Sequence, residues 1–208
     1  MKKNNLPESI GIFVSLSGLV IMAGWFFGIE ILKIILPFRG SMKFSSAFSF
    51  FLSGIMLYFI ARFKKKDREL AVIIIPIISM VIFILMASLF AAMVLGVSVG
   101  IEEILLKDSM IIDGTVAPGR PSVATMLNFF LIATMGILTT MNIKKLNKLL
   151  VIFGVMIAVI GLISVLGHSV NQPLLYYIGL GKFRLMAIYS AILFILWGAG
   201  AVLVEKNK

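Results

Sequence analysis

Six long apolar runs constrain this sequence more than any other feature. Each is 18 to 26 residues long and contains no Asp, Glu, Lys or Arg, and about 20 apolar residues in a helix cross the hydrocarbon core of a bilayer. Because hydrocarbon cannot bond to backbone polar groups, such continuous runs form helices rather than the alternating strands of a membrane barrel. We predict an all-α, polytopic membrane helical bundle with about six transmembrane helices, at residues 10–27, 44–61, 71–96, 122–141, 149–166 and 185–204.

The composition agrees with a chain embedded in lipid. Hydrophobic residues make up 61% of it and charged residues 13%, and the mean hydropathy is +1.12, which exceeds what a soluble core needs. The length of 208 residues fits one membrane domain, 1–208. The first run is long for the apolar part of a signal peptide, and Trp25, Phe26 and Phe27 stand where small cleavage-site residues would be needed. We therefore interpret this run as a helix.

The net charge of +10 is concentrated on alternate connections between the apolar runs. Twelve of the nineteen basic residues lie on the same side as the two termini, where the net charge is +8, compared with +2 on the other side. Short basic connections mark the cytoplasmic side of a membrane protein. We predict a multi-pass protein of the cell membrane with cytoplasmic N- and C-termini, and we expect no nucleic-acid partner.

The basic run 62–68 has a second interpretation besides topology. Its residues Lys64, Lys65 and Lys66 are candidates for contact with anionic lipid or a partner protein, because each basic residue near such a surface contributes about 1 kcal/mol. Short charged connections after a membrane helix usually only set its orientation. We favour the topological interpretation.

The sequence contains an internal repeat. Residues 42–54 align without gaps on residues 186–198, with six of thirteen positions identical, and a weaker third copy begins at Pro121. The segments upstream of the three copies, at 28–32, 100–105 and 172–177, also correspond. We predict three tandem hairpins, each with an outgoing helix, a short amphipathic segment on the outer face, a turn and a returning helix. The hairpins span about 10–62, 71–141 and 149–204.

Small residues and phenylalanine recur on the returning helices at spacings of three, four and seven positions. These spacings place them on one helix face, and small residues let helix backbones approach closely in lipid. We predict that this face is the packing seam of the bundle rather than a ligand site. The seam comprises Ser46, Ala47, Phe50 and Gly54, then Thr125, Phe129 and Ala133, and then Ser190, Ala191, Phe194 and Gly198.

Starting at Met42, the chain reads Met-x-x-Ser-Ser-Ala-x-x-Phe-x-x-x-Gly. With the outer segment before it, this pattern resembles the N-terminal membrane-sensor regions of bacterial and archaeal sensor histidine kinases and related signalling proteins, whose hairpins carry Met-x-x-Asn-Thr-Ala-x-x-Phe. The likeness covers most of the chain, including residues 117–120. It implies a membrane region that senses something in or near the bilayer. Only four residues follow Val204, so we expect no output domain here, and output from another chain.

Chemistry-bearing residues are few. His168 is the sole histidine, and we interpret it as an interfacial hydrogen-bonding group, with metal binding beside Glu102, Glu103 or Asp108 as the alternative. Glu102 and Glu103 are adjacent, so on a helix they point about 100° apart and do not favour paired acid–base work. The absence of cysteine excludes thiol chemistry. We predict no catalytic, cofactor-binding or metal-binding residues, no cofactor, and no enzymatic activity.

Together these features predict a non-enzymatic integral membrane module, sensory or scaffolding, that acts through a partner. The expected partners are the lipid bilayer and either other membrane protein subunits or a cytoplasmic signalling protein. One alternative is an accessory structural subunit of a multi-subunit membrane enzyme complex, for example an oxidoreductase. A second is a small-molecule transporter, for which the relevant features are a proline inside the third run and polar residues in the fourth, namely Pro76, Asn128, Thr134, Thr139 and Thr140.

Overall fold

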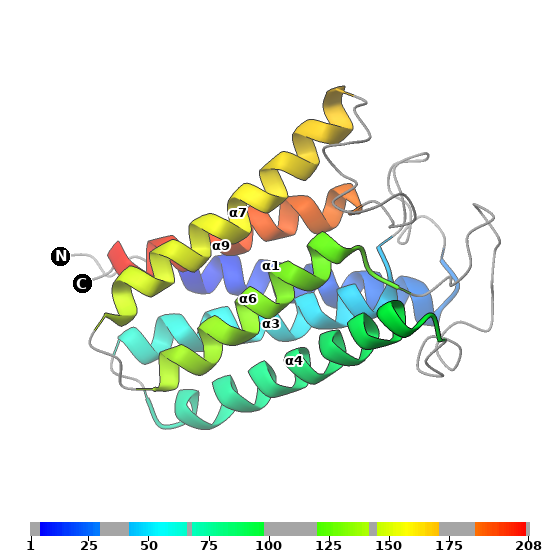
Figure 1. Ribbon diagram of the computed structural model, residues 1–208. Helices are drawn as coiled ribbons and strands as arrows, with labels where there is room; N and C mark the ends of the chain where they lie inside the picture. The colour runs from blue at the N-terminus through cyan, green and yellow to red at the C-terminus, as the bar shows by residue number, and fades with distance from the viewer. Residues whose placement is uncertain are drawn as a thin grey trace.

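The computed structural model describes residues 5–29, 42–65, 68–97, 120–141, 145–170 and 186–206. Within these ranges helices account for 87% of the residues, and none of the residues lies in a strand. The helices are α1 (Leu6–Phe26), α3 (Phe44–Lys64), α4 (Ala71–Leu95), α6 (Val123–Thr140), α7 (Leu146–Val170) and α9 (Ile188–Lys206) (Figure 1). All six are long and apolar enough to cross a membrane, which confirms the predicted six-helix membrane bundle.

Several helices extend beyond the apolar runs from which they were predicted. Helix α1 begins at Leu6 rather than at residue 10, α3 continues to Lys64, and α7 gains residues at both ends. The terminal turns of a spanning helix lie in the interface, where charged side chains reach water while the backbone stays helical. Hydropathy alone therefore underestimates helix length at the charged ends.

Proline and glycine occupy places that suit them. Pro7 lies in the first turn of α1, where its missing N–H would have had no partner within the helix. Helix α4 ends at Gly96, whose φ of 68° is the left-handed conformation that commonly closes a helix. Pro76 lies inside α4, and the helix continues through it from Ala71 to Leu95.

The returning helices α3, α6 and α9 form the inside of the bundle. In each of them 56% of the membrane-spanning window is buried, compared with 28 to 33% in the outgoing helices α1, α4 and α7. Each outgoing helix packs against its own returning helix and against the returning helix of a neighbouring hairpin: α1 on α3 and α9, α4 on α6 and α3, and α7 on α9 and α6. The result is an approximate threefold arrangement, with three inner helices and three outer ones.

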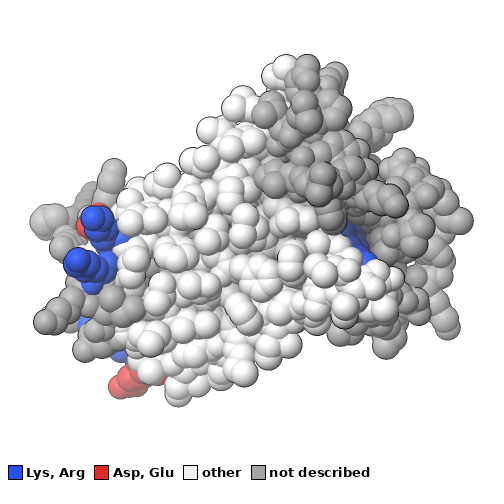
Figure 2. Space-filling view, in the orientation of Figure 1, with Lys and Arg blue, Asp and Glu red and all other residues white. Residues whose placement is uncertain are grey.

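The surface has an apolar middle and carries more charge at one end than at the other. Figure 2 shows basic and acidic residues at one end of the bundle, a smaller basic patch near the opposite end, and a broad region without charge between them. Large hydrophobic side chains such as Phe13, Ile77 and Leu127 are exposed there, as expected of a surface that faces lipid. The protein is a multi-pass membrane protein.

The two ends of the bundle are different. Helix α1 begins and helix α9 ends at the end with more charge (Figure 1), which we call the terminal end. The turns that follow α3 and α6 lie at the same end, because the helices alternate in direction. The opposite end, where the paired helices of each hairpin are joined through residues 30–41, 98–119 and 171–185, is called the hairpin end. These three segments are outside the described residues.

Candidate functional site

All residues of the sequence-predicted seam are buried, and its three phenylalanines meet in the centre of the bundle. The ring centroids of Phe50 and Phe129 are 4.9 Å apart, those of Phe50 and Phe194 are 4.6 Å apart, and those of Phe129 and Phe194 are 5.0 Å apart. All three side chains are fully buried. Such spacings are favourable for aromatic pairs, so this phenylalanine cluster joins one inner helix from each hairpin.

Glycines bring the helices of the first and third hairpins into backbone contact. A Cβ added at Gly11 would lie 2.8 Å from the carbonyl oxygen of Gly54, and one added at Gly154 would lie 2.9 Å from the carbonyl oxygen of Gly198. Real Cβ atoms do not approach other heavy atoms so closely. Only glycine therefore permits these two crossings, in the manner of the small-residue interfaces of membrane helices.

A second glycine on each of the outgoing helices α1 and α7 makes the same kind of backbone contact seven residues further along the chain. A Cβ at Gly18 would lie 2.6 Å from the carbonyl oxygen of Ala47, and a Cβ at Gly161 would lie 2.7 Å from that of Ala191. The outgoing-helix glycines are 143 positions apart in the chain, and their partners on the returning helices are 144 apart. Hairpins one and three therefore use the same interface, although the sequence alignment had identified the equivalence only on the returning helices.

The middle hairpin is packed differently. Ala133 stands where Gly54 and Gly198 stand in the other hairpins, and Phe130 of α6 makes edge-on contacts with Phe83 and Phe90 of α4, with centroids 5.3 and 6.4 Å apart. Aromatic side chains thus fill the interface between α4 and α6, whereas glycines bring the helix backbones into contact in the first and third hairpins. Gly136 of α6 abuts the side chain of Ser79 on α4.

At the hairpin end, each of the three hairpins has a hydrogen bond across its base. The indole Nε1 of Trp25 donates to the carbonyl oxygen of Met42 at 2.9 Å. The Nε2 of His168 lies 2.8 Å from the carbonyl oxygen of Met186, and because a carbonyl only accepts, that nitrogen carries the proton. In the middle hairpin the Arg120 guanidinium donates to the carbonyl oxygen of Val97. We call these three bonds the hairpin ties.

The first and third ties occupy equivalent positions. Met42 and Met186 are aligned in the repeat, 144 positions apart, and Trp25 and His168 are 143 positions apart, the same spacing as the glycines of their helices. His168 is buried and makes the hydrogen bond expected of it at a helix end. The Trp25 tie was not predicted from the sequence, because Trp25 was considered there only as a residue too large for a cleavage site. The 143-residue spacing is the signal that could have revealed it.

Two of the three basic residues proposed for lipid or partner contact, Lys64 and Lys65, are engaged within the protein. The Lys64 ammonium donates to the side-chain oxygen of Asn147 on α7. The Lys65 ammonium lies 2.5 Å from Oε1 of Glu8 and donates to the side-chain oxygen of Asn5 at 2.8 Å. Lys66 lies outside the described residues. Contact of these residues with lipid or with a partner protein therefore stays a prediction.

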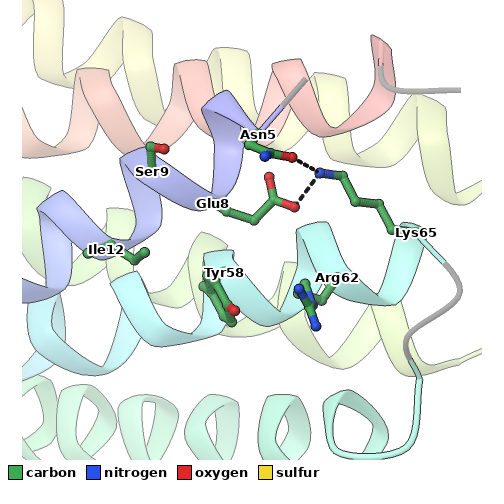
Figure 3. A pocket seen from close by; sticks show the side chains of 7 residues that line it. All are labelled: Asn5, Glu8, Ser9, Ile12, Tyr58, Arg62 and Lys65. Carbon is green, nitrogen blue, oxygen red and sulfur yellow. Dashed lines mark hydrogen bonds and ion pairs between the residues drawn. The ribbon is translucent and has the colours of Figure 1, made fainter. Parts of the chain in front are cut away.

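Glu8 and Lys65 line a cleft between the terminal ends of α1 and α3 (Figure 3). Its volume is about 500 Å³, and Asn5, Ile12, Tyr58 and Arg62 contribute to its walls. Glu8 is buried in the first turn of α1, where the positive end of the helix dipole favours a carboxylate. The sequence contained no signal that paired Glu8 with Lys65, which is 57 positions away.

The polar residues of α6 divide into two groups. The hydroxyls of Thr134, Thr139 and Thr140 donate to backbone carbonyls of their own helix, so they do not join neighbouring helices. Asn128 is fully buried, and neither its amide oxygen nor its amide nitrogen has a hydrogen-bond partner among the described residues. Asn128 is therefore a polar group that the described part of the bundle leaves unsatisfied.

No group of three His, Asp or Glu side chains that could hold a metal ion occurs in the part of the chain that the structure describes. Glu102, Glu103 and Asp108, named as alternative metal ligands beside His168, lie outside the described residues. The metal-binding alternative is therefore neither supported nor tested.

The fold and its contacts define the class of this protein: a polytopic helical membrane protein with three hairpins around a central phenylalanine cluster. Comparison with known proteins does not narrow that class. No family model matches the chain, and neither a curated protein nor a solved structure matches it.

Proposed function

We propose that this protein is a non-enzymatic membrane module, sensory or scaffolding, that acts through a partner protein. The observation that carries the proposal is the set of three hairpin ties. Each tie is a hydrogen bond between the end of an outgoing helix and the residues before the returning helix of the same hairpin. Each tie ends at or next to the start of a returning helix: Met42 before α3, Arg120 before α6 and Met186 before α9. Each tie thus links the end of an outgoing helix to the residues that precede an inner helix.

The inner helices provide a continuous path from the hairpin end to the terminal end. They pack on one another through Phe50, Phe129 and Phe194, and α3 ends beside the charged cleft at Lys65. Packed helices respond to a local shift by moving as units between discrete arrangements. A stimulus at the hairpin end would therefore alter the surface that the terminal end offers to a partner.

The proposed orientation places the terminal end in the cytoplasm, because the basic residues lie there (Figure 2). Reporter fusions after Lys66, Asp113 and Lys208 test it. We expect cytoplasmic signals after Lys66 and Lys208 and an external signal after Asp113. An external signal after Lys208 would contradict the proposed orientation.

An accessory subunit of a membrane enzyme complex is the second candidate. It is supported by α4 and α7, which are the two most apolar of the six described spanning helices and bury only 33% and 28% of their spanning windows. The exposed faces of such helices can pack on the helices of other subunits as well as on lipid. In this role the hairpin ties would serve only to hold the bundle rigid.

Purification from native membranes in mild detergent, followed by mass spectrometry, tests both candidates. We expect a kinase, cyclase or other signalling protein to be recovered in a fixed ratio to this chain. Recovery of a redox enzyme in a fixed ratio instead would contradict the sensory proposal and support the accessory one.

Variants of the ties separate sensing from scaffolding. The substitutions His168→Ala and Trp25→Phe each remove a donor, and loss of one hydrogen bond shifts a two-state equilibrium by about fivefold. A sensory module then shows a change of that size in the output of the recovered partner, while partner recovery stays the same. Ser169→Ala is the control, because Ser169 is exposed and bonds only its own helix, at the carbonyl of Val165. Unchanged output in both tie variants would leave scaffolding as the role.

A further inference from the structure

The cleft between the terminal ends of α1 and α3 contains a carboxylate oxygen of Glu8 without a hydrogen-bond donor among the described residues, and it also contains the basic side chains of Arg62 and Lys65. Oε1 of Glu8 is paired with Lys65, but Oε2 is buried and has no hydrogen-bond partner among the described residues. The Glu8 residue is only 7% exposed. A buried carboxylate oxygen without a donor is unfavourable, so this position suits a ligand that brings a positively charged N–H group.

Basic groups lie on the opposite wall of the same cleft. Arg62 lies in the last turn of α3, and Lys65 follows three positions later as the residue that caps the helix. The Arg62 guanidinium carbon is 5.9 Å from the centre of the Tyr58 ring, and both side chains line the cleft (Figure 3). A guanidinium binds phosphate well because its N–H groups match the geometry of phosphate oxygens. The cleft therefore suits a ligand with an ammonium group and a phosphate group close together.

An apolar groove adjoins the cleft and extends along α1 and α3 toward the middle of the bundle. Its volume is about 170 Å³, and it shares Ile12 and Tyr58 with the cleft. Gly11 and Gly54 lie at its base, where the backbones of α1 and α3 touch. Ile12 is 49% exposed, so the groove lies on the apolar surface that faces lipid, where an acyl chain can enter it from the bilayer.

We propose that this cleft and groove bind a phospholipid with a primary ammonium headgroup, of the phosphoethanolamine type. The ammonium group donates to Oε2 of Glu8, the phosphate accepts from Arg62, and one acyl chain lies in the groove over Gly11 and Gly54. A choline headgroup has no N–H to donate. A glycerol headgroup offers hydroxyls but no positive charge to balance the carboxylate. This proposal is independent of the proposed sensory or scaffolding function.

Lipid retention by the purified, delipidated protein tests the proposal. Phosphatidylethanolamine, phosphatidylcholine and phosphatidylglycerol with identical acyl chains are added one at a time, and bound lipid is counted by native mass spectrometry. We expect phosphatidylethanolamine to bind at least about tenfold more tightly than the other two, a ratio that one charge-assisted hydrogen bond supplies. Equal binding of all three lipids, or preference for phosphatidylglycerol, would overturn the proposal.

A competition arm separates a membrane lipid from its free headgroup. Soluble glycerophosphoethanolamine carries the ammonium and the phosphate but no acyl chain. If the groove holds a chain, this compound displaces bound phosphatidylethanolamine only at a large excess. Displacement at equal concentration would show that the site recognises a free headgroup and would overturn the lipid assignment.

Variants connect the preference to the named residues. Glu8→Gln removes the negative charge, so we expect phosphatidylethanolamine to bind only as well as phosphatidylcholine. Glu69→Gln is the matched control, because Glu69 is exposed at the same end of the bundle and should leave the preference unchanged. If Glu8→Gln keeps the full preference while remaining helical and monodisperse, Glu8 does not bind the headgroup. If that variant fails to fold, the comparison of the three lipids on the unaltered protein still shows whether the site prefers an ethanolamine headgroup.

Discussion

The indole Nε1 of Trp197 donates a hydrogen bond to the carbonyl oxygen of Ser53, 2.9 Å away and buried. Trp197 and Ser53 are 144 positions apart, so they occupy the same place in the repeat, just before Gly198 and Gly54. Equivalent residues of the first and third hairpins thus meet across the centre of the bundle. Because the bond joins α9 to α3, it holds together the same two inner helices that Phe50 and Phe194 join.

Replacing Trp197 with Phe removes this donor and keeps an aromatic side chain. We expect the free energy of unfolding to fall by about 1 kcal/mol, since the buried carbonyl of Ser53 loses its donor from Trp197. Reversible unfolding in mixed detergent micelles, followed by circular dichroism, measures the change. A stability within a few tenths of a kcal/mol of the unaltered protein, on the scale expected for exposed positions, would show that the bond contributes little.

Gly198→Ala tests the backbone contact between α7 and α9. Alanine normally stabilises a helix by about 1 kcal/mol relative to glycine, but here its Cβ would overlap the Gly154 carbonyl and lie 2.9 Å from the Cβ of Ala158. We therefore expect a loss of about 1 to 3 kcal/mol from overpacking. The neighbouring Ala199 is exposed, and Ala199→Gly is the control for helix propensity. A more stable Gly198→Ala protein would contradict the close packing.

Phe50→Ala opens a cavity in the phenylalanine cluster. The transfer contribution that dominates in soluble proteins is small here, because the surrounding lipid is also apolar. The lost packing should still lower the free energy of unfolding by about 1 to 3 kcal/mol. Phe13→Ala on α1 is the matched control, since Phe13 is 56% exposed and should change stability much less. Equal effects in the two variants would mean that the cluster is not a packing centre.

Asn128→Leu should stabilise the protein. The Asn128 amide is fully buried with no hydrogen-bond partner among the described residues, and leucine removes that penalty at a similar size. We expect a gain of about 1 to 2 kcal/mol in the free energy of unfolding. Asn147→Leu is the control and should destabilise, because Asn147 accepts from Lys64. A loss of stability in Asn128→Leu would mean that the amide has a partner beyond the described residues.

Small residues and phenylalanine of the returning helices could be selected from the sequence by their spacing. Ser46, Ala47 and Phe50 recur as Ser190, Ala191 and Phe194 at helical spacing, and these residues are buried. The hairpin ties and the pairing of Glu8 with Lys65 could not be predicted in this way. Each depends on one side chain reaching a particular atom of another segment, and hydrophobic periodicity holds no information about such contacts.

The six apolar segments and the alternation of the basic connections can be read from the amino-acid sequence, because transfer of apolar residues into lipid depends on composition. The face of each helix that turns toward the centre of the bundle does not follow from hydrophobicity. Lipid is as apolar as leucine, so hydrophobicity does not separate a lipid-facing residue such as Phe13 from a buried one such as Phe50. The inward face of each helix depends on how the side chains fit together in three dimensions. Glycines let the helix backbones touch, and three phenylalanine rings fill the centre of the bundle.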